Sequence, residues 1–208
     1  MPVNYNRVAW FYDTLSRVVF GGAIVRAQTL YLPLLEAGDS ILIVGGGTGW
    51  ILERIANMSP KGFRITYVEA SEEMIKRAKK RTIAQNEVFF INCPIEEFNS
   101  KNSFDVVITP FLFDNFLTHQ AEKIFNHINK HLKNSGLWLY SDFRQPEKIW
   151  QKGMLKIMLL FFKLLCKVEA NKLPDIETQF RKNNYTLREQ KNFYKGFITA
   201  RAYTSTQQ

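Results

Sequence analysis

The stretch ILIVGGGTGW, residues 41–50, decides the fold of this chain. Four apolar residues precede glycines at positions 45, 46, 47 and 49, and a helical pattern starts directly after them. Glycine lets the backbone turn sharply and lets a ligand approach it closely, while the N–H groups of the following helix face that ligand. The stretch therefore predicts a buried strand, a ligand-binding turn and a helix.

Strand-like and helical segments alternate on either side of this turn. Short apolar runs predict strands at residues 40–44, 64–68, 88–91, 104–108 and 137–141. Helical patterns occupy residues 51–58, 71–84 and a third segment in which Ala121, Ile124, Phe125, Ile128 and Leu132 recur at helical spacing. This alternation predicts an α/β fold with a parallel sheet covered on both faces. Ligands of such sheets bind at the carboxyl ends of the strands.

The 208 residues are expected to form one domain with three parts. Residues 1–35 predict a helical cap, and residues 36–143 predict the ligand-binding core. Residues 144–208 predict a helix from about 146 to 168, inserted before a closing hairpin of strands 186–194 and 197–204 around Gly196.

The spacing of the glycines narrows the choice of ligand. Gly45, Gly47 and Gly49 follow the pattern G-x-G-x-G, whereas a dinucleotide-binding turn needs glycine at position 50, which is Trp50. No Gly-Lys-Ser/Thr follows, which excludes a P-loop. Glu69 ends the second strand, where a carboxylate accepts hydrogen bonds from ribose hydroxyls. These features predict a nucleoside-bearing ligand.

Residues 36–143 resemble the class I S-adenosylmethionine-dependent methyltransferases, through VGGGTG at 44–49 and the acidic Glu69. The resemblance implies a three-layer, Rossmann-like fold with a mostly parallel seven-stranded sheet whose last strand is antiparallel, and S-adenosylmethionine as cofactor. YNRVAWFYD at 5–13 is similar to the N-terminal motif of methyltransferases that act on quinone precursors and other small molecules.

The same resemblance implies the residues that hold the cofactor. Met74 would lie against the adenine, Asn92 or Cys93 would receive its amino group, with Asn92 the better acceptor, and tyrosines of the N-terminal motif would close the pocket. The complete implied set is Gly45, Gly46, Gly47, Thr48, Gly49, Glu69, Ala70, Met74, Asn92, Cys93, Thr109, Tyr5 and Tyr12.

Ile43 departs from the family pattern, in which an acidic residue two positions before the first glycine supports the methionine end of the cofactor. Two alternatives follow. Either cofactor binding is weakened, or backbone carbonyls and an N-terminal side chain hold the ammonium group instead.

Transfer of an activated methyl group depends mainly on orientation in a dry pocket, although a base assists oxygen or carbon acceptors. The loop after the fourth strand offers Asp114, and His119 less strongly, as base or substrate anchor; both also fit surface or capping roles. Phe111, Phe113 and Phe116 would wall an apolar acceptor site or join the core. The expected acceptor is a small, partly apolar molecule.

The histidines predict no metal site, and the cysteines predict a reducing compartment. His127 and His131 lie four apart without a third ligand, which favours a solvated helix face, and no metal is expected. The two cysteines show no metal-ligand or disulfide pattern, so we expect a cytoplasmic protein.

The formal net charge of +9 is concentrated in the last third of the chain. Residues 1–143 carry 15 Lys and Arg against 14 Asp and Glu, whereas residues 144–208 carry 13 against 5. Alternatives to a small-molecule enzyme are therefore an RNA or protein methyltransferase that uses this basic region, or a cofactor-binding module without turnover. Nucleic acid is not the favoured partner; the apolar segment 154–166 is also a candidate for a membrane-surface contact or a homodimer contact.

Overall fold

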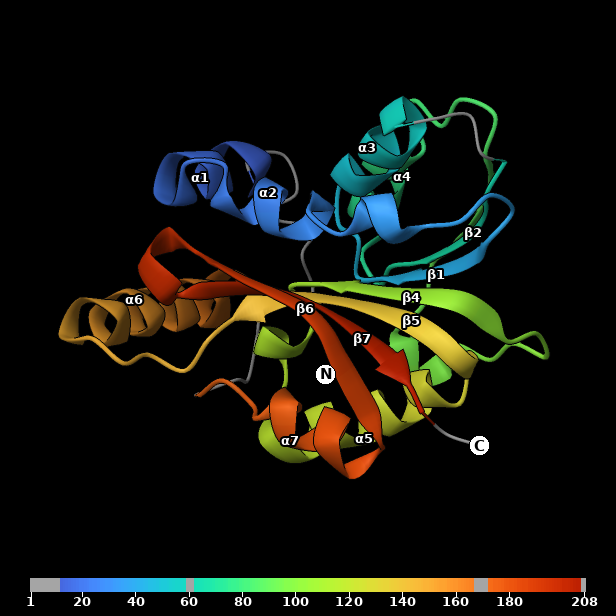
Figure 1. Cartoon of the computed structure of the whole chain (residues 1–208). Helices are drawn as coiled ribbons and strands as arrows, with labels where there is room; N and C mark the ends of the chain where they lie inside the picture. Colours follow the sequence, from blue (N-terminus) through green and yellow to red (C-terminus); the bar gives the residue numbers. More distant parts are fainter. Residues whose placement is uncertain (1–11, 59–61, 167–171, 207–208) are drawn as a thin grey trace.

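The computed structural model describes residues 12–58, 62–166 and 172–206 (Figure 1). The strands are β1 (Ser40–Val44), β2 (Arg64–Val68), β3 (Glu87–Ile91), β4 (Phe104–Pro110), β5 (Leu132–Phe143), β6 (Tyr185–Phe193) and β7 (Ile198–Ser205). The α-helices are α1 (Tyr12–Phe20), α2 (Ala23–Thr29), α3 (Trp50–Met58), α4 (Glu72–Ala78), α5 (Thr118–Asn129), α6 (Ile149–Cys166) and α7 (Ile176–Lys182). Short 3-10 turns are η1 (Leu32–Leu34), η2 (Ile95–Glu97), η3 (Phe113–Asn115) and η4 (Tyr194–Gly196).

The seven strands form one sheet in the order β3-β2-β1-β4-β5-β7-β6. β3, β2, β1, β4 and β5 run parallel, and β7 lies antiparallel between β5 and β6. The predicted fold class, with an antiparallel last strand, is therefore confirmed. The strand order reverses between β1 and β4, and the crevice at the carboxyl ends of these two strands is where such sheets bind ligands.

Helices cover both faces of the sheet, as Figure 1 shows, with α3 and α4 on one side and α5 and α7 on the other. Ile51 and Ile55 of α3 pack with Ile75 of α4 on the first face. A separate apolar cluster joins α1, α2 and α6 to the end of β5 and to β7. This cluster of α1, α2 and α6 therefore builds a cap over the carboxyl end of the sheet.

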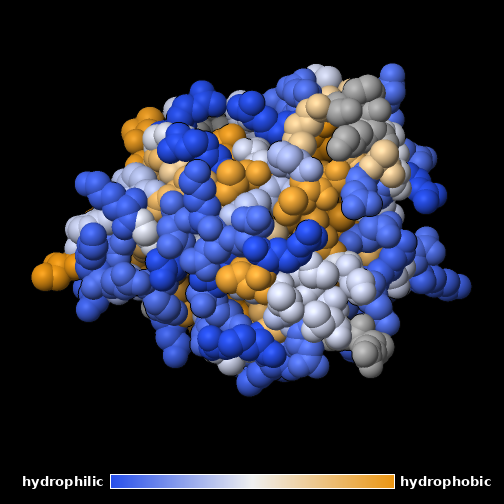
Figure 2. Space-filling model, viewed as in Figure 1, coloured by the Kyte–Doolittle hydropathy of each residue, from blue (hydrophilic) through white to orange (hydrophobic). Residues whose placement is uncertain are grey.

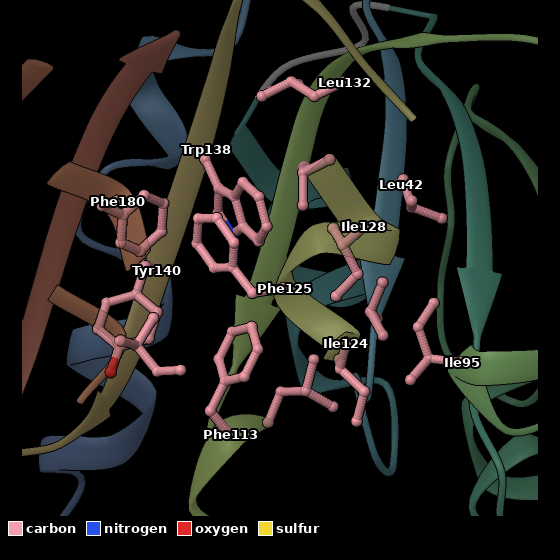
Figure 3. Packing of buried hydrophobic residues seen from close by; sticks show 14 of the residues in the cluster. Leu42, Ile95, Phe113, Ile124, Phe125, Ile128, Leu132, Trp138, Tyr140 and Phe180 are labelled. Atoms are coloured by element: carbon pink, nitrogen blue, oxygen red, sulfur yellow. The ribbon is translucent and has the colours of Figure 1, made fainter. Parts of the chain in front are cut away.

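Aromatic rings fill the core between the sheet and α5 (Figure 3). Phe125 of α5 stacks on Trp138 of β5 with ring centroids 4.8 Å apart, and Phe180 of α7 meets both rings edge-on. The buried indole N–H of Trp138 donates to the hydroxyl of Thr109 at 2.9 Å. Burial of such large rings supplies much of the favourable free energy of folding.

The elements differ from the predicted ones at three places. The helix predicted to include Leu132 ends at Asn129, because Leu132 pairs with Phe104 as the first residue of β5. The helix predicted over 71–84 ends at Ala78. α7 was not predicted, although Asp175 caps it by accepting the backbone N–H of Thr178 at 3.1 Å. Among the described residues, no helix has the length and apolar character to cross a bilayer.

Gly49 is the position at which a side chain would most directly disturb this arrangement. Its φ is +83°, and a Cβ atom would lie 2.8 Å from the Cα of Ala78 in α4. We expect Gly49→Ala to lower the free energy of unfolding by about 3 kcal/mol, measured by urea denaturation, because backbone strain and overpacking add.

Gly21→Ala is the matched control. Gly21 also has positive φ, at +56°, but a Cβ there meets nothing within 4 Å. Its expected loss is about 1 kcal/mol, from backbone strain alone. Equal losses in the two variants would show that the contact between the loop and α4 contributes nothing.

Candidate active site

The glycine loop rests on the phenol of Tyr67. The Tyr67 hydroxyl donates to the carbonyl oxygen of Gly47 at 3.0 Å, and a Cβ atom at Gly46 would lie 2.5 Å from that hydroxyl. Glycine at position 46 is therefore required by this close approach. The loop is supported from below, while its upper side stays open to a ligand.

Glu69, at the carboxyl end of β2, fixes the loop from the side. Its Oε2 accepts the backbone N–H of Gly47 at 3.1 Å, and its Oε1 accepts that of Ser71 at 2.9 Å. Burial raises the pKa of the Glu69 carboxyl, and the backbone N–H donors act against that rise. Two carboxylate oxygens offer about four acceptor sites in all, so the carboxylate keeps acceptor capacity for a ribose hydroxyl.

A cavity opens above the loop and gathers much of the predicted cofactor set. The predicted residues that line it are Gly45, Gly46, Gly47, Thr48, Glu69, Ala70 and Met74. At Gly47 a Cβ atom would meet nothing within 4 Å, so the missing side chain leaves room for a ligand against the backbone. The donor set and the open cradle fit S-adenosylmethionine.

Three predicted residues do not line this cavity. Gly49 faces Ala78 of α4. The side-chain amide of Asn92 donates to the carbonyl oxygens of Glu69 and Ala70 at 2.8 and 3.1 Å, so its nitrogen braces the Glu69 loop. The Thr109 hydroxyl is buried against Trp138.

The remaining predicted residues lie elsewhere or outside the description. Cys93 is a free thiol packed against the core on the α5 side of the sheet, and burial raises its pKa. Tyr5 lies outside the described residues. Tyr12 begins α1, but its side chain lies outside the described part of the chain.

Ile43, which departs from the family pattern, is fully buried in the core under α3. The N-terminal helices instead supply Ser16, Arg17 and Gln28 to the cavity wall. The Arg17 guanidinium lies 5.4 Å from the ring centroid of Trp50, which also lines the cavity. A guanidinium suits a carboxylate, so this cation can hold the carboxyl end of a methionine moiety.

A second, larger cavity of about 520 Å³ adjoins the first one. Its walls are apolar and come from α1, the end of β5 and α6. Phe111, Ile24, Ser16 and Asn115 line both cavities, so the two spaces meet at these residues. The volume lies within the range of small-molecule sites, which run from about 300 to 1,000 Å³.

Phe111 marks the boundary between the cavities with a strained backbone. Its φ is +52°, a region that aromatic residues rarely adopt. The backbone N–H of Phe111 donates to Ser141 O at 2.7 Å, and its ring packs on Phe143. Phe116 lines the first cavity, whereas Phe113 lies wholly in the core.

Two buried carboxyl groups lie beside this boundary. Asp114 lines the apolar cavity, and its Oδ1 accepts the side-chain amide of Asn115 at 2.8 Å. Asp142 accepts the backbone N–H groups of Phe113 and Phe143 at 3.1 and 2.8 Å. Burial raises the pKa of Asp142 to about 7; burial, with the Asp142 charge second, holds the pKa of Asp114 well above its ordinary value.

The histidines take no part in either cavity. His119 is exposed in the first turn of α5 and is not brought near the cavities. The solvated face expected for His127 and His131 is wrong, because His131 is buried and His127 contacts the carbonyl oxygen of Phe98 at 2.7 Å. In the described part of the chain, no three His, Cys, Asp or Glu side chains cluster as metal ligands.

Sequence reasoning missed Asp142 and Arg17. Asp142 directly follows the predicted strand 137–141, and the carboxyl ends of parallel strands are where a site is expected. That signal was present in the sequence. Nothing in the sequence places Arg17 beside the glycine loop, since this depends on how α1 packs.

The carboxyl pair makes folding stability depend on pH in a direction that can be measured. A carboxyl whose pKa is raised in the folded protein loses stability as pH increases from about 4 to about 7. We expect the free energy of unfolding of Asp142→Asn to exceed that of wild type by roughly 2 kcal/mol at pH 8 and to equal it at pH 4. Urea denaturation at the two pH values measures this difference.

Asp105→Asn is a control of opposite sign. Contacts with Lys133 and Ser40 lower the pKa of Asp105 to about 2, despite a contribution from burial in the other direction. This variant is expected to be less stable than wild type at pH 8, with the difference shrinking as the solution is acidified toward pH 2. A pH-independent effect of Asp142→Asn would rule out the raised pKa.

Comparison with known proteins agrees with this geometry. A family model described as a methyltransferase domain matches residues 41–136. Malonyl-[acyl-carrier protein] O-methyltransferase of Bacillus anthracis is 31% identical over 105 residues, covering 50% of this chain and 38% of that protein. The chain thus matches less than two fifths of that relative's length. The ubiquinone/menaquinone biosynthesis C-methyltransferase UbiE of Pseudomonas putida is 27% identical over 175 residues, covering 80% and 67%.

Solved structures share the fold at low sequence identity. Magnesium protoporphyrin IX methyltransferase (ChlM) of Synechocystis PCC 6803, solved with bound SAH, superposes with a TM-score of 0.68 at 16% identity and covers 97% of this chain and 95% of that one. The glycine loop, Glu69, the strand order and the matched domain lead to one conclusion. Residues 41–136 match a methyltransferase domain, the chain has the class I methyltransferase fold, and its cofactor is S-adenosylmethionine.

Proposed function

We propose that the protein transfers a methyl group from S-adenosylmethionine to a small, partly apolar acceptor that loses a proton from oxygen or carbon. The observation that carries this proposal is the junction at Phe111, where the cavity above the glycine loop meets an apolar cavity. Among the described residues, Asp114 is the one charged residue that lines this apolar cavity. An apolar wall with one titratable group suits a ring or chain bearing one reactive position.

The chain's own residues would orient the cofactor and exclude water. S-adenosylmethionine supplies a methyl group that its sulfonium already activates. Glu69 would accept its ribose hydroxyls, and Met74 would pack against its adenine. Arg17 of α1 would hold its carboxylate. Because Arg17 is a cation it cannot hold the ammonium group, so it does not decide between the two alternatives raised by Ile43.

Asp114 would serve as the base, and Asp142 as a positioning residue behind it. A carboxylate takes up a proton most effectively when its pKa lies near the working pH. Burial and the neighbouring Asp142 move the pKa of Asp114 upward, in the required direction. The proton lost by the acceptor would then reside on the Asp114 carboxylate, while the acceptor bonds to the methyl carbon, the bond from that carbon to sulfur breaks and S-adenosylhomocysteine leaves.

The names of the relatives support an acceptor atom other than nitrogen. One relative is named as an O-methyltransferase and the other as a C-methyltransferase. The RNA or protein alternative gains no support at the site, since no lysine among the described residues lines either cavity. We further propose that the protein works in the reducing cytoplasm, consistent with the free thiol of Cys93.

Cofactor binding tests the first half of the proposal. Isothermal titration of the wild type with S-adenosylmethionine is expected to show binding, and Glu69→Gln is expected to weaken it about tenfold or more, because an amide offers the ribose only one acceptor oxygen. Glu72→Gln is the matched control: Glu72 is exposed on α4 and lines no cavity, so its affinity should equal that of wild type. Absence of binding to the wild type would overturn the proposal.

Methyl transfer tests the second half. We expect labelled methyl groups from S-adenosylmethionine to enter solvent-extractable small molecules of a cell extract. Asp114→Asn should slow this transfer by about a hundredfold, the usual contribution of a positioned base, while cofactor affinity is retained. Label found only in RNA or protein would assign the alternative activity. Cofactor binding with no labelled product would assign a module without turnover.

A further inference from the structure

Helix α6 presents a second surface beside the apolar cavity. Ile149, Gly153, Ile157 and Leu160 recur three or four residues apart and therefore share one face. The side chains of Ile149, Ile157 and Leu160 are 89%, 72% and 56% exposed. Three large aliphatic side chains gathered on one helix face are unusual on the surface of a protein that has no partner there.

Lysines form a row directly beside this apolar row. Lys148, Lys152, Lys156 and Lys163 each precede one of the apolar positions or continue their spacing, and all four are exposed. α6 contains no acidic residue. The exposed surface of the helix thus divides lengthwise into an apolar strip and a cationic strip.

The apolar strip continues into the mouth of the cavity. Trp150 and Ile157 are exposed on α6 and also line the apolar cavity. On the opposite wall, Val19 of α1 lines the cavity and the adjacent Val18 is 78% exposed. Figure 2 shows apolar atoms projecting from the edge of the molecule at which Figure 1 places α6.

We infer that α6 and the exposed edge of α1 dock on an anionic lipid bilayer, so that the acceptor enters the apolar cavity from the membrane. The apolar strip enters the acyl boundary, and the lysine strip meets the anionic headgroups, which is the pattern of helices that lie in a membrane interface. The route of the acceptor rests on the proposed function, whereas the docking surface stands on the exposed residues themselves.

The distribution of charge favours a bilayer over other occupants. A second copy seated antiparallel on the same face would bring the two lysine rows together across a two-fold axis, and like charges would oppose that contact. RNA would neutralise the lysines but would leave the aliphatic strip in contact with charged phosphates. An anionic bilayer satisfies both strips at once.

Vesicle sedimentation with the full chain tests this inference. Wild-type protein is expected to sediment with vesicles of phosphatidylcholine and phosphatidylglycerol, and much less with phosphatidylcholine alone. The double variant Ile149→Ser/Leu160→Ser should reduce partitioning about tenfold or more, because it removes two aliphatic side chains from the apolar strip. Neither residue lines the cavity, so the cavity itself is unchanged. Lys152→Gln/Lys156→Gln should also reduce it about tenfold and weaken its dependence on salt.

Matched controls separate specific docking through α6 from non-specific adsorption to vesicles. Phe89→Ser removes an exposed apolar side chain from β3, at the opposite edge of the sheet from β6, and Lys101→Gln/Lys123→Gln removes two exposed lysines elsewhere. Both controls should sediment as wild type does. Equal loss in these controls, or no loss in the α6 variants, would overturn the inference.

Two further outcomes would assign the surface to another occupant and overturn the inference. One is a dimer, seen by light scattering in the absence of vesicles, that Ile149→Ser/Leu160→Ser dissociates. In that case the wild type would not sediment with vesicles. The other is salt-sensitive binding of an RNA oligonucleotide that the lysine variant alone loses, again without vesicle binding. Titration of all variants with S-adenosylmethionine in the absence of vesicles keeps a failure of docking distinct from a failure of cofactor binding.

Discussion

The hydrogen bond from the Gly47 N–H to the buried carboxylate of Glu69 joins the ends of two adjacent parallel strands, and the site is arranged around it. It fixes the glycine loop after β1 relative to the loop after β2. Since Glu69 also accepts the Ser71 N–H and Asn92 braces the Glu69 and Ala70 carbonyls, the loop after β3 is tied to the same point. The price is a buried carboxylate whose charge the backbone N–H groups must compensate.

The acceptor side obeys a different constraint, namely two carboxyl groups in a setting that contains little to solvate them. Asp142 is held by backbone N–H groups and Asp114 by the amide of Asn115, and the charge of Asp142 discourages a second charge on Asp114. Neighbouring carboxyl groups of this kind tend to share a proton. The strained backbone at Phe111 is held between this pair and the cofactor cavity by pairing with Ser141.

The cap built from α1, α2 and α6 connects the chemistry to the surface. One apolar cluster holds these helices against β7, and the Tyr194 hydroxyl at the β6–β7 connection donates to the Val19 carbonyl of α1 at 2.9 Å. The same helices leave aliphatic side chains outside and line the apolar cavity inside. A single cap therefore shapes the acceptor space and the face through which an acceptor would reach it.

The sequence by itself determined the α/β class, the five parallel strands, the closing hairpin and the placement of the glycine loop and Glu69 at the carboxyl ends of their strands, because these depend on local spacing and on strand polarity. Only the tertiary structure decided which side chains converge from distant segments. It brought Arg17 into the cofactor wall, sent Thr109 to Trp138, placed Leu132 in a strand, and paired Asp114 with Asp142. Periodicity records that a residue is apolar or polar at a given spacing, whereas these outcomes depend on how helices pack across a sheet, which no local pattern encodes.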